Sequence, residues 1–378
     1  MNPADVSSRH EPTSIFTKHQ LQLMSNLSYL PGAALEAAVK LAIQMELPLF
    51  ITGEPGTGKT ELAYWIAQNA DFQEYFGVGG EVLRFNAKTT STSKDLLYRY
   101  DAIRHFRDSQ VGTRQVAVSS EQSPEGGGQL AVGIEQSRMG INVLNYIHFG
   151  ALGQAIIGAR SQRRVVLVDE IDKAPRDFPN DLLFEFDQLG FRIEEATPTE
   201  LHSFSGWSEM PSLKEMKVEK PPFDEQDFIF FTEKEDRKRP AKERTVKKPV
   251  LILTSNSEKN LPDAFLRRCA FFHIEFPGEK RLLEILMAKG LYDENRNKQL
   301  VEGALKFFIE LREKAGLRRK PATAELIAWV DFLSKLDPPV NPADRLSQAD
   351  LERVKTTISL LGKNPEDFRR IGEQLKRK

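Results

Sequence analysis

Eight consecutive residues have the types and spacing of a phosphate-binding loop. They are Gly53, Glu54, Pro55, Gly56, Thr57, Gly58, Lys59 and Thr60, which match G-x-x-x-x-G-K-[ST]. The glycines would let the backbone approach a phosphate, and a helix beginning here would direct N–H groups at the same oxygens. We expect Lys59 to reach the β- and γ-phosphates of a nucleotide and Thr60 to be one of the ligands of a bound Mg²⁺. Glu61 is the last residue that we include in the predicted nucleotide-binding segment. The alternative is a glycine-rich turn that only caps a helix.

Two adjacent carboxylates form the second chemical feature. Asp169 and Glu170 follow the apolar run 165–168. At the carboxyl end of a strand, Asp169 would hold Mg²⁺ through water, while Glu170 would orient and polarise an attacking water. A strand-ending Asp-Glu pair is weak evidence alone, because acidic turn residues are common. Together with the phosphate loop, it predicts nucleotide hydrolysis.

The elements that would position these residues follow an α/β pattern. Apolar periodicity predicts a helix over 31–44 and another over 61–68, and short apolar runs predict strands at 47–52, 82–86, 165–168 and 249–254. Nearly unbroken apolar strands are typical of a parallel sheet flanked by helices. After Pro277 the periodicity is helical only. We therefore predict an N-terminal extension (1–26), a nucleotide-binding α/β core (27–277) with insertions near 109–140 and 197–248, and a smaller all-α domain (278–378).

Composition narrows the class of protein. Lys and Arg number 53 against 54 Asp and Glu, and the chain of 378 residues has a formal net charge of -1 and one cysteine. The mean hydropathy of -0.42 is ordinary for a globular protein and does not fit a fibrous or disordered one. Because no apolar run could span a membrane and no disulfide can form within the chain, we expect a cytoplasmic protein without membrane insertion.

Other candidate surfaces have ordinary interpretations. The charged segment 233–248 is predicted to be a solvated loop, with contact to a partner or nucleic acid as the alternative. The segment 98–106 interleaves aromatic and basic residues, and we favour an amphipathic helix over a strand-binding surface. The six histidines have no metal-ligand spacing. We therefore expect no metal apart from nucleotide-bound Mg²⁺.

Several strings together resemble AAA+ ATPases: GEPGTGKT, LVDEID, the polar Asn256 after a strand, and LPDAFLRR at 261–268. The runs YLPGAALEAAVKLAIQMELPLFITGEPGTGKTELA and DEIDKAPRDFPNDLLFEFDQ are similar to the MoxR branch. The resemblance implies an α/β core with a helical lid and a homo-oligomeric ring, commonly a hexamer, with ATP and Mg²⁺ sites between subunits. It also implies a protein client or partner, some with a von Willebrand factor A domain. A McrB-like assembly associated with nucleic acid, or a nucleotide switch without turnover, are the alternatives.

The resemblance also suggests roles for individual residues. Asn256 takes the sensor 1 place, where its amide would hold the lytic water or the γ-phosphate. Arg268 aligns with the arginine finger that reaches a neighbouring subunit's site, and Arg267 is a second candidate. The alternatives are a turn-forming Asn256 and arginines that cap a helix. Asn86 resembles the polar residue that holds the catalytic glutamate away from water until the ring engages a substrate.

Two positions depart from the family pattern. The stretch 320–326 offers Thr323 or Ala324 where a sensor 2 arginine is usual, and Lys320 or Arg319 could substitute. Cys269 stands where a phenylalanine is usual. We interpret Cys269 as a small buried hydrophobe, because no other feature suggests thiol chemistry.

Overall fold

The computed structural model describes residues 29–110, 142–216, 218, 220–256, 261–344 and 346–376. The predicted extension 1–26 and nearly all of the predicted insertion at 109–140 lie outside these residues. The chain divides into two compact units. The larger contains Pro31–Pro55 and Leu62–Glu275, and the smaller contains Gly56–Glu61 and the chain from Phe276 onward.

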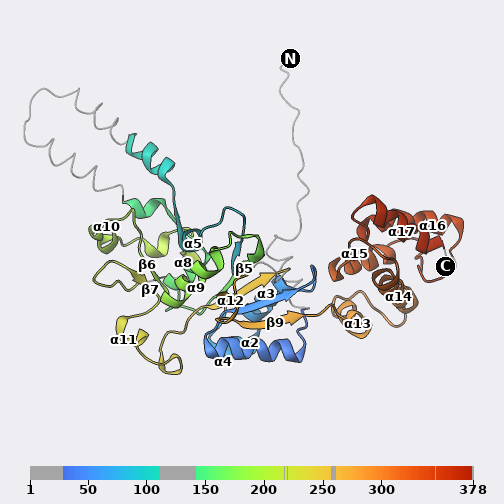
Figure 1. Cartoon of the computed structure of the whole chain (residues 1–378), viewed down its shortest axis with the longest axis horizontal. Coiled ribbons are helices and arrows are strands. Elements are labelled where there is room, and N and C mark those ends of the chain that lie inside the picture. The colour runs from blue at the N-terminus through green and yellow to red at the C-terminus, as the bar shows by residue number, and fades with distance from the viewer. Residues whose placement is uncertain are drawn as a thin grey trace, which may run out of the picture. The chain divides into compact units, whose positions relative to one another are not determined.

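A five-stranded sheet is the centre of the larger unit (Figure 1). Its order is β2-β5-β8-β1-β9, and every neighbouring pair is parallel. The strands are β1 (Leu49–Gly53), β2 (Leu83–Asn86), β5 (Val165–Asp169), β8 (Val250–Ser255) and β9 (Ala270–Ile274). The predicted parallel sheet is confirmed, and its four predicted strands end within one residue of the expected positions.

The central strands are buried on both faces, which explains their unbroken apolar composition. Alternate residues such as Phe50, Val166 and Leu253 join one large apolar core. That core includes α8 (Ala151–Ile157) and α9 (Phe178–Gln188). Figure 1 shows α2 (Ala33–Met45) on the opposite side of the sheet from α8 and α9. Helices therefore cover both faces, as the sequence predicts.

Further elements complete the larger unit. The helices are α3 (Lys59–Gln68), which begins in the smaller unit, α4 (Ala70–Phe76), α5 (Ser93–Leu97), α10 (Pro198–Ser203), α11 (Lys234–Arg237) and α12 (Asp263–Leu266). Two antiparallel pairs of short strands accompany them, β3 (Tyr98–Tyr100) with β4 (Ile147–Phe149), and β6 (Gly190–Phe191) with β7 (Ile229–Phe230). The predicted helix over 98–106 is therefore wrong in its first three residues, which pair with β4, and helix follows from 102.

The charged segment 233–248 is more ordered than a solvated loop. Asp236 is buried and accepts N–H groups from Thr245 and Val246 at 2.9 and 3.2 Å. The guanidinium of Arg244 pairs at 2.7 Å with Glu46, which lies 198 residues earlier, and both side chains are largely buried. These partners are invisible in the local composition, so the prediction of a solvated loop is wrong for this part of the segment.

The smaller unit has a second apolar core that contains no strand among the described residues from 276 onward. Its helices are α13 (Glu279–Ala288), α14 (Lys298–Lys314), α15 (Thr323–Ser334), α16 (Gln348–Thr357) and α17 (Pro365–Lys376). The indole of Trp329 is fully buried and donates to Thr357 at 2.7 Å. Helix-only periodicity is thus confirmed here, while the role of these helices as a lid stays a prediction. No described helix combines the length and apolarity needed to cross a membrane.

Candidate nucleotide-binding site

The phosphate loop connects the end of β1 at Gly53 to the start of α3 at Lys59. Gly56 and Gly58 have φ values of 76° and 88°, in the left-handed region that glycine adopts readily. A Cβ on Gly58 would also lie 2.7 Å from the ring of Tyr29. Lys59 is only 8% exposed, at the first turn of α3. These observations fit a backbone cradle for phosphates with a lysine at its base.

The strands that carry the other predicted residues end at one edge of the sheet. Thr52 on β1 is level with Ser255 on β8, and Asn86 on β2 is level with Asp169 on β5. In open parallel sheets, ligands bind outside the carboxyl ends of the strands. Since β8 lies between β1 and β5, it separates the strand of the phosphate loop from the strand of the carboxylates.

Asp169 is held by two side chains that the sequence did not single out. The hydroxyl of Thr254 donates to Oδ1 at 2.5 Å, and the guanidinium of Arg84 donates to Oδ2 at 2.6 Å. The same Thr254 oxygen accepts the backbone N–H of Glu170 at 3.1 Å. Thr254 therefore fixes the position of both acidic residues. A carboxylate has further lone pairs, so Asp169 can still accept from a metal-bound water.

We expect Thr254→Val to destabilise the larger unit by about 1–3 kcal/mol, because it leaves Asp169 and the N–H of Glu170 without their buried partner. Valine has nearly the same shape, so packing is retained. Thermal unfolding of the two proteins measures the difference. Thr254→Ser keeps the hydroxyl and should recover most of the loss. If the serine variant is no more stable than the valine variant, the hydroxyl is not the stabilising group.

Glu170 has an unusual backbone and an exposed partner. Its φ is 57°, although it is not glycine, and its N–H is fixed by Thr254. Its carboxylate pairs with the ammonium of Lys173 at 2.5 Å, and this hydrogen bond raises the pKa of Lys173. Among the described residues, no hydrogen bond joins Glu170 to Asn86. In this conformation Lys173 holds the carboxylate, and the restraint by Asn86 stays a prediction.

Asn256, Arg267 and Arg268 are exposed. Asn256 follows the last residue of β8, at the same edge of the sheet as Asp169. Arg267 occupies the C-cap position of α12, and its choice between a helix cap and a second finger candidate stays a prediction. Arg268 lies 3.9 Å from Asp187 with 60% of its side chain exposed. Burial raises the pKa of Cys269 to about 12, in agreement with an unreactive thiol.

The smaller unit places the start of α15 beside the phosphate loop residue Gly56. A Cβ on Gly56 would lie 2.6 Å from the Cβ of Ala322, directly before the first residue of α15, Thr323. The region of the missing sensor 2 arginine therefore packs against the loop through small residues. Arg319 and Lys320, the predicted substitutes, are exposed.

Sequence reasoning missed Arg84, Thr254 and Lys173. Thr254 ends the predicted strand 249–254 and Lys173 stands three residues after Glu170, so spacing could have indicated both. Arg84 gave no such signal, because its pairing with Asp169 spans 85 residues and depends on the neighbouring strands β2 and β5.

The fold is consistent with a P-loop ATPase core. Comparison with solved structures finds the crystal structure of a candidate ATPase from Cytophaga hutchinsonii, with 11% sequence identity and a TM-score of 0.33. The match covers 94% of this chain and 84% of that one. No family model matches the chain, and no curated protein matches it. At this similarity the match assigns neither family nor activity.

Proposed function

We propose that this chain is a Mg²⁺-dependent ATPase. The observation that supports the proposal best is the position of Asp169 and Glu170. Both lie at the carboxyl edge of the sheet, where the loop ending in Lys59 also leaves β1. Gly56 and Gly58 of the loop have positive φ, which suits a backbone cradle for phosphates. The preference for ATP over GTP rests on the resemblance of the loop and strand sequences.

Each residue has a distinct task in this proposal. The loop N–H groups and Lys59 bind and orient the phosphates, while Thr60 and Asp169 would hold the metal. A bound Mg²⁺ would neutralise charge on the phosphate oxygens. Glu170 orients the attacking water and accepts its proton, which requires the carboxylate to leave Lys173. Asn256 is suited to hold the same water, because it directly follows β8, the strand whose Thr254 donates a hydrogen bond to Asp169.

We further propose a MoxR-like AAA+ ring, commonly a hexamer, that couples hydrolysis to remodelling a partner protein. The sequence strings and the exposed Arg268 support this assignment. The McrB-like alternative gains no support from the segment 233–248, because Arg244 is held by Glu46 and burial lowers the pKa of Lys248. Light scattering with and without ATP and Mg²⁺, run beside phosphate release, tests the proposal. A monomer that never assembles and never hydrolyses ATP would contradict it.

The assignment of Arg268 predicts complementation between subunits. Arg268→Ala should lower turnover by about 1,000-fold, the lower end of the effect of an arginine finger. Mixed rings of Arg268→Ala and Glu170→Gln subunits should regain turnover, because some sites then receive Arg268 from one subunit and Glu170 from the other. Phosphate release from the mixture measures this. Without any recovery, Arg268 has only a structural role beside Asp187.

A further inference from the structure

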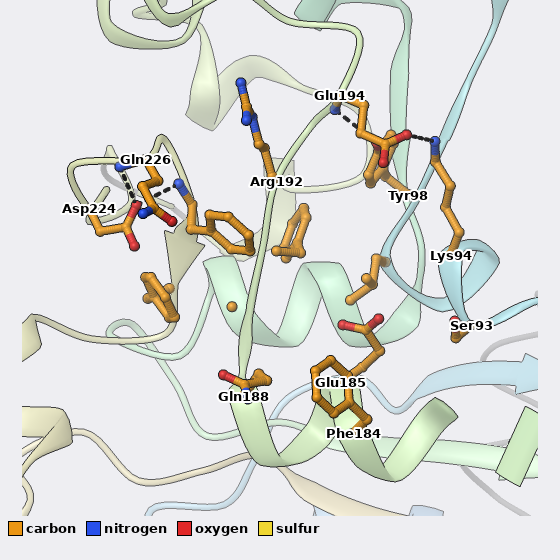
Figure 2. Close-up of a pocket in the computed structure, with 15 residues that line it drawn as sticks. Ser93, Lys94, Tyr98, Phe184, Glu185, Gln188, Arg192, Glu194, Asp224 and Gln226 are labelled. Atoms are coloured by element: carbon orange, nitrogen blue, oxygen red, sulfur yellow. Dashed lines mark hydrogen bonds and ion pairs between the residues drawn. The ribbon is translucent and has the colours of Figure 1, made fainter. Parts of the chain in front are cut away.

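A second pocket lies in the larger unit, between α5, the end of α9 and the β6–β7 pair (Figure 2). It has a volume of about 560 Å³, which suits a large side chain and the backbone that carries it. None of its lining residues belongs to the predicted nucleotide site. Much of its wall is aromatic, from Tyr98, Phe184, Phe191, Phe228 and Phe230.

Aromatic rings at this pocket already hold cations of the chain itself. The ammonium of Lys94 lies 4.9 Å from the centre of the Tyr98 ring, and the guanidinium of Arg237 lies 3.3 Å from that of Phe230. The faces of aromatic rings attract cations, and the attraction is strongest where water is excluded. Lys94 is also paired with Glu194 and Glu195 at 3.0 and 3.2 Å, so its charge is balanced.

Glu185 contributes an unbalanced negative charge. Its side chain projects from α9 into the pocket (Figure 2). It is half-buried, and no described residue forms a hydrogen bond or ion pair with its carboxylate. Burial, followed by the negative charge of Asp181, raises the pKa of Glu185. A carboxylate in this environment is stabilised by any cation that enters the pocket.

Two features favour an extended polypeptide over a small amine. Figure 2 shows Arg192 and Glu185 at opposite ends of the pocket. One end of the pocket therefore carries a positive charge and the other end a negative charge. Arg192 is exposed and has no ion pair with the part of the chain that the structure describes. Between these ends runs β6, which pairs with β7 along one edge and has no second strand partner among the described residues. An open strand edge can pair with the backbone of an extended segment.

We propose that this pocket binds an extended segment of a partner polypeptide, with a Lys or Arg side chain of the partner lying among the aromatic rings and pairing with Glu185. This interaction goes beyond ATP hydrolysis. Because the pocket shares no residue with the phosphate loop, binding can be measured without nucleotide, and its failure would leave the proposed ATPase activity untouched.

Fluorescence anisotropy with short labelled peptides tests the proposal on the full chain. The peptides share glycine-serine flanks and a Leu-X-Leu centre, in which X is Lys, Arg, norleucine or Glu. We expect the Lys and Arg peptides to bind about tenfold more tightly than the norleucine peptide, as for one charge-assisted contact. Glu185→Gln should remove this preference. Glu235→Gln is the matched control, because Glu235 lies outside the pocket, is exposed and pairs with Lys238, and this variant should leave the preference intact.

Three results would overturn the proposal. One is that the Lys and norleucine peptides bind equally tightly, or that none of the four peptides binds. Another is an unchanged preference in Glu185→Gln. The third is binding of free N-acetyl-lysine amide as tightly as the Lys peptide, which would identify an amine site rather than a polypeptide site. Phe184→Ala gives an independent test, since Phe184 is 59% exposed and its loss should weaken the Lys peptide without unfolding the protein. Tyr75→Ala removes another exposed ring, outside the pocket, and should leave peptide binding unchanged.

Discussion

Glu170→Gln is expected to lower phosphate release by about 100- to 10,000-fold while ATP binding is retained. Glutamine has the shape of glutamate but cannot accept the proton of the attacking water. The fold should survive, because the carboxylate is 40% exposed and its partner Lys173 is also exposed. The hydrogen bond from the Glu170 N–H to Thr254 is independent of the side chain. Single-turnover phosphate release, together with nucleotide binding by calorimetry, measures the two effects separately.

Asp172→Asn is the matched control, because it removes a neighbouring carboxylate of the same turn without touching Glu170. Its turnover should stay near that of the wild-type chain. If Glu170→Gln hydrolyses ATP at the normal rate, Glu170 is not the base. If both variants lose turnover equally, the defect belongs to the turn at 171–173 and not to one carboxylate. If ATP keeps the Glu170→Gln chain assembled, the trapped state can be used to capture a partner.

Lys59→Ala is expected to abolish nucleotide binding or nearly so. Each hydrogen bond to a charged group contributes about 1.5–3 kcal/mol, so the loss of contacts to two phosphates should weaken binding by at least about 100-fold. Titration with a fluorescent ATP analogue measures this. Lys40→Ala is the control, because Lys40 lies on the surface of α2 and pairs only with Glu36 among the described residues.

Lys59 is buried, so its replacement could also change the stability of the chain. Lys59→Met keeps most of the apolar stem and should bind nucleotide as poorly as the alanine variant, with a melting temperature closer to the wild-type value. If Lys59→Met binds ATP normally, the loop is a helix cap and the nucleotide proposal fails. Loss of binding in both variants at normal stability would locate the phosphates at this loop.

The sequence predicted those parts of the fold that depend on local periodicity. Buried central strands must be apolar on both faces, so runs such as 165–168 and 249–254 were recognisable without a structure. The segment 98–106 was harder, because its first residues form a strand only by pairing with β4, nearly 50 positions later. The segment 233–248 was misjudged for a similar reason, since Arg244 pairs with Glu46, which lies 198 residues earlier in the chain.

The candidate site shows the same limit. Lys59, Asp169 and Glu170 belong to short contiguous motifs, so the sequence identified them together as candidates. The side chains that hold Asp169 come from other strands. Arg84 and Thr254 act on Asp169 only because the order of the strands places β2 and β8 on either side of β5. The pocket around Glu185 was also unpredictable, because its wall combines three segments that are separated along the chain.

Thr254 has a consequence for how the site would respond to its ligand. Its oxygen joins the side chain of one acidic residue to the backbone of the next, and Asn256 stands two positions further along the same strand. A displacement of β8 would therefore act on the side chain of Asp169 and on the backbone of Glu170 at once. The carboxylate of Glu170 is held separately by Lys173, so it can turn towards a water while its backbone stays anchored to β8.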